Sequence, residues 1–506
     1  MLLTPSVVLS PAEDGTLTCM HVADSSDLDA LFVGEPAFER RCYMLDVSRD
    51  RVPTLDTLAW LIGVLRRLRF NELQLYIEHT FTYQGHEIVW RDASAYTPED
   101  LAVLRQLASE AGIELVANLN CFGHMQRWLA HADYRERAEC PGGISDHRSA
   151  VLGPPTCLEP TVQNAEFALD LIREMVQAIG SDRVMIGGDE PAELGSGRSA
   201  ERVAAAGAAH VYKEHLLRII EPLIAEGLEV QFWGDQLVEA ADGVAWIPGG
   251  ASAVVWHYDP PSAEHAGFMA AAEPFIEASK KFWVAAGTSS WNSLIGRNGA
   301  AAANIADAVA AGSKHGALGF MLADWGDNGH LQPLAVSLPS IVRAGVGAWR
   351  GASVDVEVGP IIDSLLEAES GTGQMIDGLG SLGDWTGLAV PNGSPIFAAL
   401  VPLADSITGR VNLTGCAAAG QALDEALVRL PNSLASSERG RMIGEELVAV
   451  VRLAKIGLDR LQGRPVEPER LEQALVAQRV GWLRTSRLGG VADSLGRLEL
   501  PSTREH

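Results

Sequence analysis

The chain has 506 residues, of which 47% are hydrophobic and 21% charged, the composition of a globular protein with a sizeable core. Acidic residues outnumber basic ones by 65 to 39, and the formal net charge of -26 repels phosphate backbones and anionic membranes, so neither nucleic acid nor a membrane surface is an expected partner. Because domains average about 150 residues and barrels run to about 250, this length predicts one large domain with appendages.

The cysteines and the N-terminal residues indicate the cellular compartment of the protein. The six cysteines lack the CxxC pairing and the nearby histidines of zinc sites, so they are predicted to be reduced thiols, with a Cys140–Cys157 bridge as a minor alternative. The N-terminus lacks the basic region and cleavage site of a secretory signal, and no apolar run reaches the roughly 18 residues of a membrane helix. These features predict a cytoplasmic protein.

Residues 1–38 predict a short β-like N-terminal appendage, with strand-like pieces at residues 6–10 and 16–22. A different pattern begins near residue 40, where short apolar strands alternate with helical segments. The eight predicted strands are residues 42–47, 72–77, 113–119, 184–188, 229–233, 252–256, 282–286 and 319–322.

Eight βα repeats favour an α/β fold, a (β/α)8 TIM barrel over residues 39–352. An open doubly wound sheet would also alternate, but its glycine-rich turn is missing after the first strand, where the chain reads Asp46-Val47-Ser48-Arg49. The helices expected between the strands are residues 54–69, 98–111 (capped by Thr97), 164–179, 199–226 and 301–313.

Two further regions are not part of this alternation. Residues 128–160 interrupt the third βα unit and predict an ordered loop over the barrel mouth. Residues 353–506 predict a mainly helical C-terminal region, with helices at 436–462 and 468–488 and an irregular glycine-rich connection at 371–393. The C-terminal region carries no motif that predicts chemistry, and it could equally mediate a homodimer.

The fourth strand leads into Gly187-Gly188-Asp189-Glu190-Pro191. A proline stops the strand there, so both carboxylates are placed at its C-terminal end, which is the catalytic face of a parallel barrel. Taken alone, an Asp-Glu dipeptide is more often a solvated turn. Because neighbouring residues at a strand end point in different directions, the two are not expected to face one another across a substrate.

Aromatic and polar side chains follow the other strands. A sugar ring has apolar faces that stack on indole and a rim of hydroxyls that form hydrogen bonds, so this mixture predicts a carbohydrate pocket. Each residue separately also suits a core or ion-pair role, as Glu78 and Asp46 would if they only paired with barrel arginines. The candidate substrate-binding residues are Arg49, His124, Trp233, Trp256, Tyr258, Trp291, Trp325 and Asp327.

The segment Gly187–Glu190 resembles the signature of glycoside hydrolase family 20, the β-N-acetylhexosaminidases. Other positions agree in order along the chain: the first-strand segment with Arg49, the pair Gly123-His124, Trp233 and Trp256, and Trp325-Gly326-Asp327. The resemblance covers roughly residues 40–345 and implies a sugar-hydroxyl role for Arg49.

Two departures from the family stand out. The family's tyrosine after the seventh strand, which holds the acetamido oxygen, is replaced by Thr288-Ser289-Ser290-Trp291, so Tyr258 or Trp291 would have to substitute. The last carboxylate is Asp327 where the family has glutamate, which would alter recognition of the sugar's O4 and O6.

The resemblance implies an exo-acting β-N-acetylhexosaminidase that removes terminal GlcNAc or GalNAc by substrate-assisted retaining catalysis on a small glycoside or oligosaccharide. Glu190 would be the acid and then the base, Asp189 would hold the acetamido N–H, and no metal or organic cofactor is needed. One alternative is an exo-β-glycosidase for a sugar without an acetamido group, with Glu78 or Asp327 as partner to Glu190. Another is a catalytically silent sugar-binding barrel.

Overall fold

The computed structural model describes residues 25–145, 152–235, 243–262, 266–352, 356–403 and 407–498. Eight parallel strands close into a barrel in the order β1-β10-β9-β8-β7-β6-β3-β2, and β2 pairs with β1 to complete it. Every predicted strand is present, with ends displaced by a few residues at most. The strands are β1 (Arg40–Asp46), β2 (Glu72–Ile77), β3 (Glu114–Leu119), β6 (Arg183–Met185), β7 (Glu229–Trp233), β8 (Ala251–Trp256), β9 (Phe282–Gly287) and β10 (Gly319–Asp324).

The strands are buried on both faces, which explains their nearly continuous apolar sequences. Along β1, Cys42 and Met44 belong to the cluster inside the barrel, whereas Tyr43 and Leu45 belong to the larger core under the outer helices. The outer helices are α1 (Leu55–Arg67), α3 (Pro98–Glu110), α6 (Val162–Ile179), α8 (Ala208–Ala225), α9 (Gly267–Glu277), α10 (Asn298–His315) and α11 (Leu338–Arg350).

Local sequence sets several helix ends. Thr97 caps α3 through a reciprocal capping box with Asp100, and α6 ends at Gly180 in the left-handed conformation. The single helix expected over residues 199–226 is wrong, because Gly207 (φ 88°) divides it into α7 (Ala200–Ala206) and α8.

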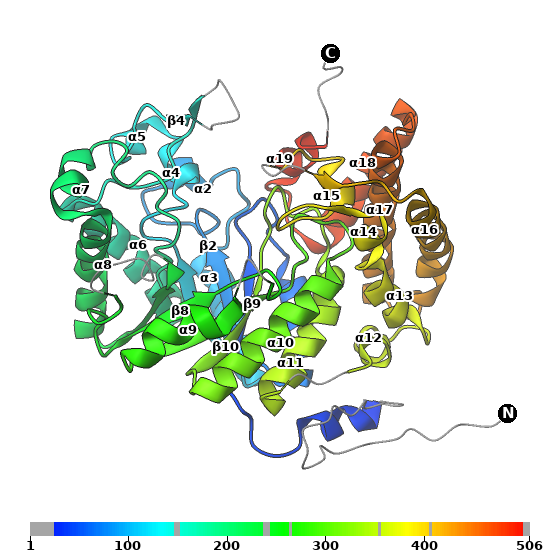
Figure 1. Cartoon of the computed structure of the whole chain (residues 1–506), viewed down its shortest axis with the longest axis horizontal. Coiled ribbons are helices and arrows are strands. Elements are labelled where there is room, and N and C mark those ends of the chain that lie inside the picture. The colour runs from blue at the N-terminus through cyan, green and yellow to red at the C-terminus, as the bar shows by residue number, and fades with distance from the viewer. Residues whose placement is uncertain are drawn as a thin grey trace.

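The region that follows the barrel forms a helical block beside it, coloured yellow to red in Figure 1. Buried Arg51 joins the two parts: it pairs with Glu446 at 3.0 Å and lies over the Trp482 ring. The elements of this block are α12 (Val358–Leu366), α13 (Thr372–Leu379), α14 (Leu382–Trp385), β11 (Leu388–Ala389), α15 (Pro395–Ala398), β12 (Thr408–Gly409), α16 (Leu413–Ser433), α17 (Glu438–Leu461), α18 (Pro468–Thr485) and α19 (Val491–Gly496).

Some predictions outside the barrel need correction. The irregular connection expected at residues 371–393 contains the helices α13 and α14, because Ile376, Leu379 and Leu382 are buried in the core. The strands expected at residues 6–10 and 16–22 lie outside the described residues, and the described part of the appendage forms a 3-10 helix, η1 (Ser25–Phe32), rather than a strand.

The predicted mouth loop contains short elements of its own. Within and beside it lie α2 (Glu87–Trp90), α4 (Gln126–Leu129), α5 (Ala132–Arg135) and the two-residue strands β4 (Ile144–Ser145) and β5 (Leu152–Gly153), above the left side of the barrel in Figure 1. The described cysteines Cys42, Cys121, Cys140, Cys157 and Cys416 are free thiols, so Cys140 and Cys157 form no bridge. Within the described parts of the chain, a search for helices of membrane-crossing length and hydropathy finds none.

Candidate active site

The turn after β6 presents Asp189 and Glu190. Gly187 (φ 68°) and Gly188 (φ 87°) both have left-handed backbone, and a Cβ at Gly187 would lie 1.7 Å from Asn120 Oδ1. That oxygen accepts a hydrogen bond from the Gly188 amide at 3.0 Å. The two glycines are therefore needed for the chain to pass Asn120 and bring both carboxylates to the mouth of the barrel.

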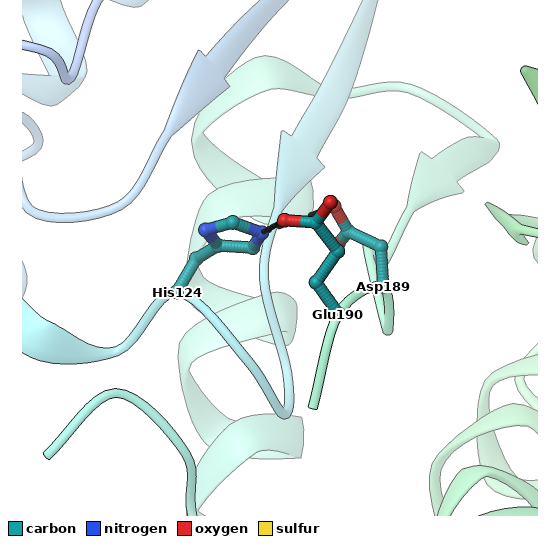
Figure 2. Close-up of side chains that lie close together, drawn as sticks. All are labelled: His124, Asp189 and Glu190. Atoms are coloured by element: carbon teal, nitrogen blue, oxygen red, sulfur yellow. Dashed lines mark hydrogen bonds and ion pairs between the residues drawn. The ribbon is translucent and has the colours of Figure 1, made fainter. Parts of the chain in front are cut away.

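His124, from the loop after β3, lies against both carboxylates (Figure 2). Its Nε2 donates to Asp189 Oδ2 at 3.1 Å and lies 3.6 Å from Glu190 Oε2. The expectation that Asp189 and Glu190 point in different directions is wrong, because both turn toward this imidazole. They converge on one histidine instead of facing one another across the cavity.

The charges of this group are interdependent. Burial lowers the pKa of His124, but the neighbouring Asp189 carboxylate outweighs burial and raises that pKa to about 9, so the imidazole is charged at neutral pH. The pKa of Glu190 is raised by partial desolvation at the cavity wall and by Asp189, while the His124 cation opposes the rise. This is the environment that keeps a carboxylic acid protonated above its ordinary pKa.

Asp189 and Glu190 differ in exposure. The side chain of Glu190 is 56% exposed, whereas the whole Asp189 residue is only 7% exposed. Asp189 Oδ1 is shielded from solvent and has no hydrogen-bond partner among the described residues. A buried carboxylate oxygen without a donor is costly, so this oxygen is suited to receive an N–H from a ligand.

Arg49 lies on the side of the His124 ring that faces away from the two carboxylates. Its Nη1 donates to Asp46 Oδ2 at 3.0 Å, and its Nε lies 3.6 Å from Glu78 Oε1. The guanidinium also lies over the rings of Tyr76 and Trp325, with 4.7 and 4.9 Å to the ring centroids. Asp46 and Glu78 thus pair with an arginine, the structural role weighed for them from the sequence.

Five aromatic side chains form the walls. Tyr258 stacks on Trp256 with centroids 5.1 Å apart, and it meets Trp291 edge to face at 5.2 Å. Trp325 Nε1 donates to the Tyr258 hydroxyl at 2.9 Å. Trp233, tilted against Trp325 at 5.9 Å, completes the set. Apolar rings with polar edges are thus present on several sides of the carboxylates.

Of the residues after β9 that stand in place of the family tyrosine, Thr288 and Ser290 bond within the barrel, and Trp291 alone lines the cavity. Thr288 Oγ1 and Ser290 Oγ donate to the buried Asp324 carboxylate at 2.7 and 2.6 Å. A Cβ at Gly287 would lie 2.9 Å from Tyr258 Cδ1 and 2.4 Å from Trp291 Cη2. Glycine at this strand end therefore makes room for the Tyr258 ring, which comes from the neighbouring strand.

All ten predicted site residues line one cavity of about 390 Å³. Four side chains outside that predicted set also line it: Gln126, Asn328, Asn392 and Arg497. Asn392 and Arg497 come from the C-terminal region, and no local pattern around them indicates a site. A larger cavity of about 930 Å³ lies between α16, α17 and α18, and none of the ten residues lines it.

His124, Asp189 and Glu190 also present one ligand atom each within 4.8 Å of one another, a spacing that could hold a metal ion. No metal ligand is predicted here from the sequence. Because the pKa of His124 is raised to about 9, a cation would have to displace the imidazole proton at neutral pH.

Most of the barrel sequence is similar to a known family of proteins. Residues 38–284 match the family model described as glycosyl hydrolase family 20, catalytic domain. Hexosaminidase D from Homo sapiens is 27% identical over 172 residues, which is 33% of this chain and 33% of that protein. Beta-hexosaminidase subunit beta from Rattus norvegicus is 23% identical over 174 residues, 32% of this chain and 31% of that protein. The chain thus matches about a third of the length of these curated relatives.

Solved structures are similar to this chain at low sequence identity. A β-N-acetylhexosaminidase from Bacteroides fragilis is 15% identical with a TM-score of 0.49, over 63% of this chain and 67% of that one. A chitobiase from Flavobacterium johnsoniae is 13% identical with a TM-score of 0.49, over 92% of this chain and 78% of that one. Over residues 38–284, the chain is thus similar in sequence to the catalytic domain of glycoside hydrolase family 20.

Proposed function

We propose that this protein is an exo-acting β-N-acetylhexosaminidase that removes a terminal GlcNAc or GalNAc with retention of configuration. The observation that carries the proposal is the state of Asp189: His124 holds one carboxylate oxygen, and the other is buried without a donor. The N–H of a 2-acetamido group would supply that donor. A carboxylate so placed orients and polarises the acetamide, so that the acetamido oxygen can attack C1 of the sugar.

Glu190 is the proposed acid and base. In the first step its proton passes to the glycosidic oxygen as the bond from that oxygen to C1 breaks, and the acetamido oxygen forms a new bond to C1. In the second step Glu190 takes a proton from water and the water oxygen bonds to C1, as the bond between C1 and the acetamido oxygen breaks and restores the acetamido group on the sugar. The raised pKa and the exposure of Glu190 support this role.

Tyr258 is proposed to replace the family tyrosine. Its hydroxyl accepts from Trp325 Nε1 and so has its own proton left to donate. Burial raises the pKa of this hydroxyl well above the ordinary value, and the negative charges of Asp189 and Asp327 act in the same direction. A protonated phenol close to the carboxylates can donate to the acetamido carbonyl oxygen.

Arg49 and Asp327 are proposed to hold the sugar hydroxyls, with Trp233, Trp256, Trp291 and Trp325 around the ring. Shielded Nε1 donors of Trp233 and Trp256 have no partner among the described residues, so each can also bind a ligand oxygen. Two-point hydrogen bonding combined with ring stacking is the usual means of pyranose recognition.

A second candidate is an exo-β-glycosidase for a sugar without an acetamido group. The residues after β9 favour it, because this segment offers no tyrosine to the cavity and the hydroxyls of Thr288 and Ser290 are committed to Asp324. The partner of Glu190 would then be Asp327, since Glu78 is buried against Arg49 and Tyr76.

The test is hydrolysis of p-nitrophenyl β-glycosides of N-acetylglucosamine, N-acetylgalactosamine, glucose and galactose by the wild type, Asp189→Asn and Glu190→Gln. Activity confined to the acetamido sugars and lost in both variants is expected. Comparable turnover of the glucoside, with no effect of Asp189→Asn, would establish the second candidate instead. Binding of a monosaccharide in a calorimeter, with hydrolysis of none of the four, would indicate a silent sugar-binding barrel.

A further inference from the structure

Asn392 belongs to the C-terminal region yet lies in the wall of the candidate active site. It occupies a turn between β11 and α15 with left-handed backbone (φ 47°), and it lines the cavity. Two hydrogen bonds fasten this turn to Asn292 in the loop after β9: Ser394 N to Asn292 O at 2.9 Å, and Asn292 Nδ2 to Asn392 O at 3.1 Å. The C-terminal region therefore builds part of the pocket.

The orientation of the Asn392 amide is determined by its neighbours. Its Oδ1 accepts from Trp291 Nε1 at 3.0 Å and from Arg297 Nη2 at 3.2 Å. Both partners can only donate, so the oxygen of the amide must face them. The Nδ2 group is left on the other side, and it donates to no other described residue.

Neighbouring residues link this amide to the part of the cavity wall that holds Asp327. Asn328, next to Asp327, donates from Nδ2 to Asn292 Oδ1 at 2.8 Å, and Asn292 is the residue that fastens the Asn392 turn. Asp327, Asn328 and Asn392 all line the cavity. Arg297, which donates to Asn392, is also close enough for its charge to act on the Asp327 carboxyl.

We propose that Asn392 is a specificity-determining residue that donates from Nδ2 to the O4 or O6 hydroxyl of the terminal sugar. The inference rests on the proposed function, because it assigns Asp327 to that end of the ring. A carboxylate can only accept from a hydroxyl, whereas the amide N–H donates to the hydroxyl oxygen, so the two contacts are complementary. A pocket that binds a hydroxyl in this way discriminates against the analogue that lacks it.

The experiment compares kcat/KM on three aryl glycosides: the N-acetylhexosaminide that the wild type prefers, its 4-deoxy analogue and its 6-deoxy analogue. Asn392→Ala should lower kcat/KM about 3- to 30-fold on the parent sugar and on one deoxy analogue, and less than about twofold on the analogue that lacks the contacted hydroxyl. The matched control is Asn292→Ala, which weakens the turn but leaves the Asn392 amide. It should affect all three substrates alike.

An equal loss on all three substrates with Asn392→Ala would mean that Asn392 only holds Trp291, and would overturn the proposal. If that variant does not fold, a crystal structure of the wild type with bound monosaccharide decides: Nδ2 within hydrogen-bond distance of O4 or O6 supports the contact, and a greater separation from both rejects it. A wild type that hydrolyses no acetamido sugar would instead reject the proposed function, which keeps the two failures distinguishable.

Discussion

Replacing Asp189 by Asn tests the step on which the proposed mechanism depends. The substitution keeps the shape of the side chain and removes its charge. In the wild type Oδ2 accepts from His124 Nε2 at 3.1 Å, and Oδ1 is buried without a partner. Asparagine would still offer one oxygen to a neighbour. The loss of kcat/KM therefore measures the effect of the removed charge and not that of a cavity left by a smaller side chain.

The size of the loss follows from two contributions. A charge-assisted hydrogen bond is worth about 1.5 kcal/mol more than a neutral one. As the acetamido oxygen attacks C1, positive charge develops on the acetamide, and half a unit charge about 4 Å from a carboxylate at an effective dielectric of about 20 is worth about 2 kcal/mol. Together they amount to about 3 to 4 kcal/mol, or roughly a 10²- to 10³-fold fall in kcat/KM.

The assay is kcat/KM on p-nitrophenyl N-acetylglucosaminide and on the glucoside, with thermal unfolding as a check on folding. A 10²- to 10³-fold loss on the acetamido sugar is expected, with little change in any residual glucosidase activity. A loss of the same size on both sugars would refute the reasoning, because Asp189 would then act through His124 or Glu190 and not on the acetamide.

Four further predictions follow from the same geometry. Glu190→Gln should lower kcat about 10²- to 10⁴-fold on a substrate with a poor leaving group and far less on a dinitrophenyl glycoside, since only the former needs an acid; equal losses on both would count against its role. His124→Gln removes the cation that lowers the pKa of Glu190, so that pKa rises and the basic limb of the kcat/KM profile should move to higher pH; a shift to lower pH would contradict the assignment. Tyr258→Phe should cost about 10- to 10²-fold on acetamido sugars only, and a wild-type rate would leave the acetamido oxygen to another residue. Gly187→Ala should lower the free energy of unfolding by about 2 to 4 kcal/mol, against about 1 kcal/mol for the control Gly112→Ala, which has the same positive φ but open space around it; equal losses would mean that crowding at Gly187 is relieved easily.

The His124–Asp189 pair also predicts how stability depends on pH. The ordinary pKa of histidine is near 6.5, and in the folded protein that of His124 is raised to about 9. The charged imidazole therefore stabilises the fold fully below pH 6.5, and this contribution is lost as pH rises from 6.5 through 9. The free energy of unfolding of the wild type should fall over that range by more than that of His124→Gln, and parallel curves would contradict the pair.

Much of the barrel could be predicted because its signals are local. Strands such as β2 are buried on both faces and so read as short apolar runs, and Thr97 with Asp100 marks the start of α3. Gly187 and Gly188 before two carboxylates can be recognised in the sequence because the turn needs positive φ at those positions. The parallel topology then gathers the residues that follow the strands at one face, whatever lies between them.

Other features depend on contacts between distant parts of the chain. Helices α13 and α14 form because Ile376, Leu379 and Leu382 are buried in the core, and weak local propensity gives no sign of this. Asp189 and Glu190 approach His124 because opposite charges attract. That attraction exists only once the ends of β3 and β6 are adjacent in the folded barrel.

The wall of the pocket shows most clearly which features depend on the sequence and which depend on the tertiary structure. The sequence by itself determined which strand ends carry carboxylates and aromatic rings, since spacing along the chain sets which side chains reach the mouth. Only the tertiary structure decided that Tyr258 fills the space beside Gly287, and that Asn392, 101 residues after Trp291, fixes the Trp291 indole. The physical reason is that hydrogen bonding and packing act over a few ångströms in space, and no periodicity records which distant residues the folded chain brings together.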